Sequence, residues 1–161
     1  MTLWRTYYHL VWATHNRHPL ILTDYEPILY KYLHQKIHHL DAQSYAIGGM
    51  PDHIHLIVSI PPKISIAEFV KHLKGGSSRY LNQSIAHQNF AWQREYGVFT
   101  LGRKQLDDAI DYVKQQKQHH TESTLIHALE SETPRINCGL VEKAAPQLRN
   151  RTFTIGLQIT S

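Results

Sequence analysis

The sequence predicts an α+β fold in which an antiparallel sheet of four to five strands carries two helices on one face and a third helix on the other. Patterns typical of strands occur at residues 7–14, 42–48, 53–60 and 98–101. Apolar residues recur at helical spacing after Thr23, after Ser65 and from Gln105 to about His120. The order strand, helix, strand, strand, helix, strand is the split β-α-β pattern of a ferredoxin-like sheet, and the extra helix follows it.

The length and composition fit one compact domain. The chain has 161 residues, of which 42% are hydrophobic and 19% are charged. It has no apolar run near the roughly 18 residues of a membrane span and no signal-peptide pattern, so we expect a cytoplasmic protein. Its single cysteine, Cys138, excludes an internal disulfide. Lys and Arg (17) exceed Asp and Glu (13), which favours a polyanionic partner.

The first predicted strand has two distinct faces: Tyr8, Leu10 and Trp12 share one, while Tyr7, His9 and Val11 share the other. The loop after it, residues 15–19, is polar and cationic. Two interpretations of this loop stay equally open, a contact with phosphate groups and an ordinary solvated loop.

The first predicted helix begins with a capping box, because Thr23 and Glu26 can each satisfy a backbone donor, and it ends near Leu40. Its clustered histidines fall on the polar side, which favours a solvated face over a metal site; they are His34, His38 and His39. The second strand follows, and the short link at residues 48–52 predicts antiparallel pairing with the third.

The strand at residues 53–60 separates two kinds of side chain. Ile54, Leu56, Val58 and Ile60 share one face, while His53, His55, Ile57 and Ser59 share the other. Residues two apart on a strand lie roughly 6.5 to 7 Å apart at Cα. His53 and His55 can therefore supply two ligands to one cation, with a third required from elsewhere. The alternative is that both histidines only hydrogen-bond to neighbours.

The second predicted helix begins with another capping box, Ser65 and Glu68. The pair Gly75–Gly76 stands among basic and hydroxyl side chains at or near its end. This pattern indicates either a phosphate contact or a helix break with a solvated charged face, after which the helix resumes near Tyr80.

An aromatic loop at residues 90–97 precedes the short strand at residues 98–101. Its side chains Trp92 and Tyr96 have two interpretations. They either close off the core or stack on unpaired bases, and the packing interpretation is slightly favoured.

The last predicted helix carries Tyr112 and Gln116, which lie one above the other because they are four residues apart. Alone, Tyr112 is typical of an aromatic side chain beside a core. The apolar stripe of this helix has to be buried against the open face of the sheet, because the first two helices cover the opposite face. Tyr112 and Gln116 should therefore lie beside His53 and His55.

Two motifs resemble those of a known superfamily. The run His53-Ile54-His55 looks like the His-hydrophobe-His signature of the HUH endonucleases. The run Tyr112-Val113-Lys114-Gln115-Gln116 is similar to the Tyr-x-x-x-Gln helix of their single-tyrosine transposases, of the insertion-sequence and REP-associated types. Further similar runs occur at residues 8–12, 48–55, 74–79 and 92–97, in the expected order. The resemblance covers residues 7 to about 120.

The resemblance implies a metal-dependent transposase that cuts and rejoins single-stranded DNA with hairpin ends. His53, His55 and Gln116 would hold a divalent metal, Mg²⁺ or Mn²⁺. Tyr112 would be the nucleophile that forms a 5′-phosphotyrosine intermediate. The candidate DNA contacts are Arg17, Lys74, Arg79 and Arg94. A homodimer is expected, in which the tyrosine helix completes the partner's site, although REP-associated relatives can act as monomers.

The resemblance assigns residues 1–130 to the HUH catalytic domain and leaves residues 131–161 as a C-terminal tail of unknown role, with residues 152–159 as the candidate fifth strand. Histidine-triad nucleotide hydrolases are excluded, because Ile57 stands where they need a third histidine. A zinc hydrolase is disfavoured, because the chain has neither a His-Glu-x-x-His run nor a cysteine pair. The remaining alternative is a non-catalytic DNA- or RNA-binding module of the same fold.

Overall fold

A computed structural model of the chain describes residues 3–84 and 89–116. Its elements are β1 (Tyr7–Ala13), the 3-10 turn η1 (His15–Arg17), α1 (Glu26–His39), β2 (Gln43–Met50), β3 (His53–Ser59), α2 (Ile66–Ser84), β4 (Gly97–Leu101), the 3-10 turn η2 (Arg103–Gln105) and α3 (Leu106–Lys114). This order confirms the predicted α+β fold. The candidate fifth strand, the tail at residues 131–161 and Cys138 lie outside the described residues.

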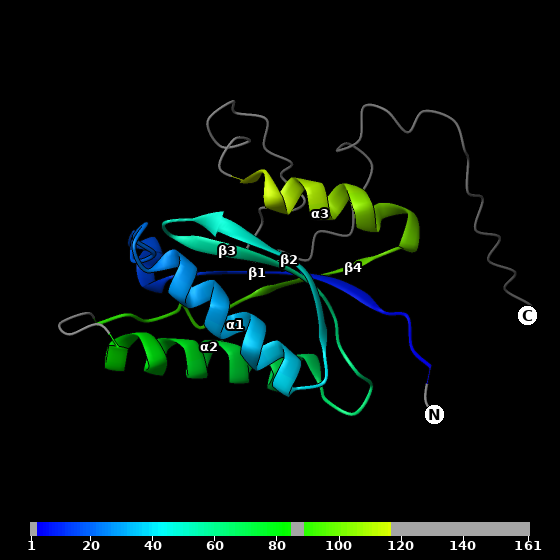
Figure 1. Ribbon diagram of the computed structural model, residues 1–161, viewed down its shortest axis with the longest axis horizontal. Helices are drawn as coiled ribbons and strands as arrows, with labels where there is room; N and C mark the ends of the chain where they lie inside the picture. The colour runs from blue at the N-terminus through cyan, green and yellow to red at the C-terminus, as the bar shows by residue number, and fades with distance from the viewer. Residues whose placement is uncertain (1–2, 85–88, 117–161) are drawn as a thin grey trace, which may run out of the picture.

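The four strands form one antiparallel sheet in the order β2-β3-β1-β4. The first and third strands of the chain are therefore central, as the split β-α-β pattern predicts. Helices α1 and α2 lie on one side of the sheet and α3 lies on the other (Figure 1). None of the helices within the described ranges is long and apolar enough to cross a membrane.

Two apolar cores lie on the two faces of the sheet. The larger one, under α1 and α2, joins the inward side chains of the central strands to those of both helices; its fully buried members include Leu10, Trp12, Leu33, Ile54, Leu56 and Phe69. The smaller one, under α3, contains Ala46, Ile57, Leu106, Ala109, Tyr112 and Val113. Because both faces are covered, all seven residues of β3 are buried, and its histidines lie inside the protein.

The predicted capping box at Thr23 is wrong, whereas the one at Ser65 is partly confirmed. Helix α1 begins at Glu26, and no side chain caps it. Instead, the carbonyl oxygen of Leu22 accepts the backbone amides of Tyr25 and Glu26 at 2.9 and 3.0 Å, so a turn leads into the helix. Ser65 Oγ accepts a hydrogen bond from the backbone amide of Glu68 at 3.2 Å, which is one of the two hydrogen bonds of a capping box.

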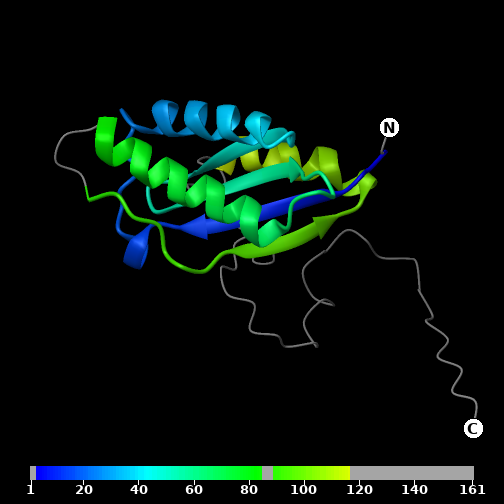
Figure 2. The same cartoon turned by 90° about the horizontal axis from the view of Figure 1, so that it is seen from below.

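Of the two interpretations of Gly75–Gly76, the helix break is wrong, because α2 continues from Ile66 to Ser84. A Cβ atom at Gly76 would lie 2.3 Å from the Tyr32 hydroxyl oxygen of α1. The glycine therefore permits the close contact of the two helices, which lie side by side in Figure 2. Nothing lies within 4 Å of the corresponding Cβ position at Gly75. Tertiary packing, rather than helix termination, accounts for Gly76.

Candidate active site

Strand β3 holds two histidines on the face that α3 covers. His53 and His55 are 1% and 0% exposed, and their ring centroids lie 5.1 Å apart with planes inclined at 73°. This spacing follows from the two-residue period of a strand, which turns alternate side chains to the same face. The two imidazoles are therefore close enough to serve one cation.

Helix α3 brings Tyr112 to the same face of the sheet, and Gln116 follows two residues after the end of the helix. Tyr112 is 5% exposed and Gln116 is 1% exposed. The Tyr112 ring lies 6.3 Å from that of His55, centroid to centroid, at a steep angle of 83°. Tyr112 therefore lies beside His55, while Gln116 lines a pocket with Gly48 and Gly49, which pair with His55 and Ile54 in the strand register.

Gly48 of β2 permits α3 to lie this close to the sheet. It pairs with His55 in the strand register, and a Cβ atom there would lie 2.1 Å from the Val113 carbonyl oxygen of α3. Because Val113 follows Tyr112 directly, the lack of a side chain at Gly48 determines how closely Tyr112 approaches the sheet.

Asp52 holds the His53 ring. Its Oδ1 lies 2.7 Å from His53 Nδ1, and its Oδ2 accepts from Arg17 Nε at 2.9 Å. A carboxylate has no proton to donate, so His53 Nδ1 carries the hydrogen of the shorter contact. Arg17 Nη2, 3.3 Å from the same nitrogen, cannot then donate to it. This tautomer leaves Nε2 as the basic nitrogen of His53.

Asp52 is ionised at neutral pH. Partial burial raises the pKa of its carboxyl group, but the hydrogen bonds and charges of His53 and Arg17 outweigh burial and lower the pKa to about 2. The carboxylate therefore acts as a hydrogen-bond acceptor for both neighbours.

His9 of β1 also belongs to this site, although the sequence analysis gave it no role. It is fully buried, and its Nε2 lies 2.8 Å from His55 Nδ1. The signal that could have found it is its place on the same face as Val11, since β1 and β3 are adjacent central strands and Val11 pairs with His55.

The residues present fit a divalent metal ion. The atoms that would coordinate it, His53 Nε2, His55 Nε2 and Gln116 Oε1, are all buried side-chain atoms of the site. Within the described part of the chain no group of three or more His, Cys, Asp or Glu could hold a metal, so the two histidines would need a ligand of another type, such as the buried amide oxygen of Gln116. Imidazole nitrogens with an amide oxygen, and no thiolate, suit borderline to hard divalent cations.

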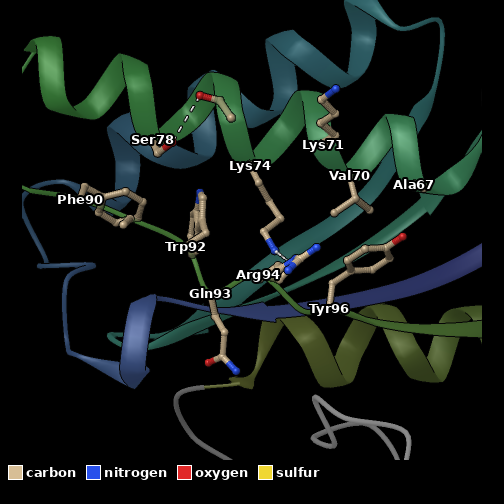
Figure 3. Close-up of a pocket in the computed structure, with 12 residues that line it drawn as sticks. Ala67, Val70, Lys71, Lys74, Ser78, Phe90, Trp92, Gln93, Arg94 and Tyr96 are labelled. Carbon is tan, nitrogen blue, oxygen red and sulfur yellow. Dashed lines mark hydrogen bonds between the residues drawn. The ribbon is translucent and has the colours of Figure 1, made fainter.

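A groove of about 430 Å³, which we call the α2 groove, lies on the other side of the sheet from α3 (Figure 3). Its walls are α2 and the aromatic loop, with cations from Lys71, Lys74 and Arg94 and rings from Phe90, Trp92 and Tyr96. Aromatic rings and basic groups lie together in this groove. Proteins that bind unpaired nucleic acid combine the same two kinds of side chain.

The predicted DNA contacts do not form one cluster. Lys74 donates to the carbonyl oxygens of Arg94 and Glu95 at 2.9 and 3.0 Å, so its ammonium group holds the aromatic loop (Figure 3). Arg94 is exposed beside it, and Arg79 is exposed farther along α2. Arg17 lies instead at the edge of the histidine site, with its side chain 48% exposed.

Trp92 packs against the core, which was the slightly favoured of the two interpretations made from the sequence. Its Nε1 donates to Ser77 Oγ at 2.8 Å, and its ring meets that of Trp12 edge to face at 5.9 Å. Backbone pairing of Trp92 with Thr14 ties the aromatic loop to the end of β1. The α2 groove and the loop at residues 15–19, which we call the Arg17 loop, are therefore connected at one end of the sheet. The three histidines of α1 are exposed, as predicted for a solvated face.

Comparison with known proteins identifies relatives of the chain. Residues 2–116 match the family described as "Transposase IS200 like". Over 121 residues the chain is 30% identical to the transposase for insertion sequence element IS200 of Salmonella typhimurium, covering 71% of this chain and 79% of the relative. It is 28% identical over 116 residues to the ISDra2 transposase TnpA of Deinococcus radiodurans, covering 68% and 82% of the two chains.

Two solved structures are similar in fold. A crystal structure at 1.90 Å resolution, of a Deinococcus radiodurans protein described as a transposase, has a TM-score of 0.59 at 27% identity and covers 76% of this chain and 92% of its own. A REP-associated tyrosine transposase bound to a REP hairpin has a TM-score of 0.57 at 16% identity and covers 74% of each chain. The second similarity concerns the fold alone. The matched family range ends at residue 116 and includes His53, His55, Tyr112 and Gln116.

Proposed function

Because this chain belongs to the IS200-like transposase family, we propose that it cuts and rejoins single-stranded DNA ends through a covalent tyrosine intermediate. The observation that supports this proposal most strongly is the position of Tyr112 against His55, with His53 beside His55 on the same strand. A nucleophile beside a set of metal ligands is the arrangement that phosphoryl transfer requires.

Tyr112 is the proposed nucleophile. Its hydroxyl oxygen attacks the phosphorus of one phosphodiester, and the bond from phosphorus to the 3′ oxygen breaks. The products are a 5′-phosphotyrosine and a free 3′-hydroxyl, which takes up a proton as the tyrosine loses one. Because the number of phosphoester bonds is unchanged, the 3′-hydroxyl of another strand can reverse the step without an external energy source. Cutting followed by such rejoining moves a DNA segment.

His53, His55 and Gln116 are the proposed ligands of a divalent cation, Mg²⁺ or Mn²⁺. When bound, such a cation supplies positive charge to the phosphate oxygens as negative charge develops on them. The residues of the chain do the rest: Asp52 fixes the His53 ring through its Nδ1–H, and Gly48 lets α3 bring Tyr112 close to His55. These contacts support a preorganised site rather than one formed after DNA binds.

The α2 groove and the Arg17 loop are the proposed DNA-binding surface for hairpin-bearing ends. Arg94 in the groove and Arg79 on α2 are exposed cations suited to phosphates of a stem. The backbone amide of His15 donates to the Ala91 carbonyl oxygen at 2.8 Å, which joins the groove to the Arg17 loop. An unpaired strand that leaves the groove can follow this connection to Arg17 and then to His53. Lys74 acts on DNA through the loop that it holds.

Residues 1–130 are the proposed catalytic domain, since the whole described site lies before residue 117. The proposed assembly is a homodimer in which the tyrosine helix completes the partner's site. A monomer in which Tyr112 serves its own chain is the alternative. A mixture of His55→Ala and Tyr112→Phe proteins distinguishes them, because only exchanged helices restore cleavage. A protein ending at residue 130 should still cleave, and loss of its cleavage would contradict the domain assignment.

The test of the proposed function compares cleavage with binding. Labelled single strands that span the hairpins flanking the gene are incubated with protein and Mg²⁺ or Mn²⁺. We expect Tyr112→Phe to bind these strands as the wild type does and to cut none of them. The matched control is Tyr80→Phe, which removes the hydroxyl of a tyrosine that is 40% exposed on α2 and should cut normally. Equal cleavage by wild type and Tyr112→Phe would exclude Tyr112 as the nucleophile. Tight binding without cleavage by the wild type would support the binding-module alternative.

A further inference from the structure

Both histidines of β3 have their Nδ1 atom in contact with a neighbouring side chain. His53 Nδ1 meets the Asp52 carboxylate at 2.7 Å, and His55 Nδ1 meets His9 Nε2 at 2.8 Å. In each case Nε2 is the ring atom left facing the site. The two contacts come from different elements, since Asp52 precedes β3 and His9 lies on β1.

The contact between the two imidazoles allows only one hydrogen between the nitrogens. One neutral ring donates and the other accepts, and the geometry alone permits either direction. The proposed function decides the direction. If His55 Nε2 is a metal ligand, that nitrogen carries no proton, so the ring proton lies on Nδ1 and is donated to His9 Nε2. His9 then carries its own proton on Nδ1.

We propose that His9 is a positioning residue, which accepts the Nδ1–H of His55 and so holds the His55 ring with its Nε2 toward the metal. The inference rests on the proposed function, because it assumes that His55 binds the metal. His9 touches neither the DNA nor the reacting atoms in this account. It acts only through the tautomer and the orientation of His55.

The side chains around His9 hold its ring in place as a hydrogen-bond acceptor for His55. The His9 and His55 ring planes differ by 16° with centroids 5.0 Å apart, so the hydrogen bond lies nearly in the plane of both rings. His9 is 0% exposed, and Phe99 of β4 packs on it with the ring centroids 5.8 Å apart. His9 pairs with Ile57 in the strand register, which makes it a diagonal neighbour of His55 across two hydrogen-bonded central strands. Rotation of either ring would break the hydrogen bond between His9 and His55.

The first test measures metal binding without DNA. The Mn²⁺ affinity of metal-free protein is determined by electron paramagnetic resonance of the free ion for wild type, His9→Phe and His9→Gln. We expect His9→Phe to bind Mn²⁺ about 10- to 100-fold more weakly, as loss of an outer hydrogen bond to a metal ligand does. Gln has an amide oxygen at the position of the histidine Nε2, so His9→Gln should recover most of the affinity. The matched control His72→Phe replaces an exposed histidine of α2 and should bind as wild type does.

The second test needs no substitution at His9. Nitrogen-15 shifts of the imidazoles in the wild type loaded with diamagnetic Mg²⁺ report which nitrogen carries the proton, and the His55 and His9 signals are assigned from His55→Ala. We expect protons on Nδ1 of both rings. A proton on Nε2 of His9, donated to a bare His55 Nδ1, would overturn the inference, as would unchanged Mn²⁺ affinity in folded His9→Phe.

The failure of this inference is separable from failure of the proposed function. If wild type binds no Mn²⁺, or if His55→Ala binds it as tightly as wild type does, the proposed ligand set is wrong and the role of His9 is rejected with it. If wild type binds Mn²⁺ and His55→Ala does not, the ligand set stands, and the comparison of His9→Phe with His9→Gln decides the role of His9.

Discussion

Gly48→Ala should displace helix α3 and reduce cleavage strongly, while it lowers the stability of the fold only modestly. The added Cβ would lie 2.1 Å from the Val113 carbonyl oxygen, whereas real Cβ atoms essentially never approach an atom within 3.0 Å. Because the opposing atom belongs to the backbone, no rotamer change relieves the contact, and α3 itself has to withdraw. Displacement of reacting groups by about 1 Å can reduce a rate on the order of 100-fold. We therefore expect single-strand cleavage to fall by about two orders of magnitude.

The assay follows cleavage of a labelled hairpin-bearing strand together with binding and thermal unfolding. Binding should change little, because helix α2, which walls the groove, lies on the opposite side of the sheet from α3 (Figure 1). Overpacking typically costs about 1 to 3 kcal/mol of the free energy of unfolding. The control for stability alone is Gly75→Ala, which meets nothing within 4 Å and should raise helix stability by up to about 1 kcal/mol; Gly75 lines the α2 groove, so its cleavage is not compared. Wild-type cleavage by Gly48→Ala would refute the role of this contact in placing Tyr112.

Three further predictions follow from single contacts. Asp52→Asn should weaken Mn²⁺ binding about 10-fold in a titration of metal-free protein, because His53 Nδ1–H loses a charged acceptor; unchanged affinity would contradict that role. Gly76→Ala should lower the free energy of unfolding by on the order of 1 kcal/mol in urea, because its Cβ would meet the Tyr32 hydroxyl. Adding Tyr32→Phe should recover most of this loss, and no recovery would count against the contact. Arg94→Ala should weaken binding of hairpin DNA and reduce the slope of log affinity against log salt by about 1, whereas an unaltered slope would mean that Arg94 meets no phosphate.

The sheet was predictable from local pattern because its two faces differ in chemistry. Ile54, Leu56 and Val58 alternate with His53 and His55, so the sequence alone indicates which side packs on the two helices. The position of α3 followed from a global requirement, since its apolar stripe has to be buried and the other face is already covered.

The parts that sequence reasoning missed depend on contacts between distant residues. Gly76 favours a helix break when considered alone, but its neighbour is Tyr32, which lies more than forty residues earlier in the chain. The start of α1 depends on a backbone carbonyl rather than on the side chain of Thr23. The role inferred for His9 depends on the register of β1 against β3, which no local pattern reveals.

Covalent trapping is the direct test of whether Tyr112 becomes bonded to DNA during cleavage. Purified protein is incubated with Mg²⁺ or Mn²⁺ and with labelled single strands that span the DNA beside its gene, and the products are separated under denaturing conditions. We expect a label that stays with the protein, is lost with chelator or with Tyr112→Phe, and maps to a peptide containing Tyr112. An adduct of equal yield in Tyr112→Phe, or no adduct from strands that bind tightly, would contradict it.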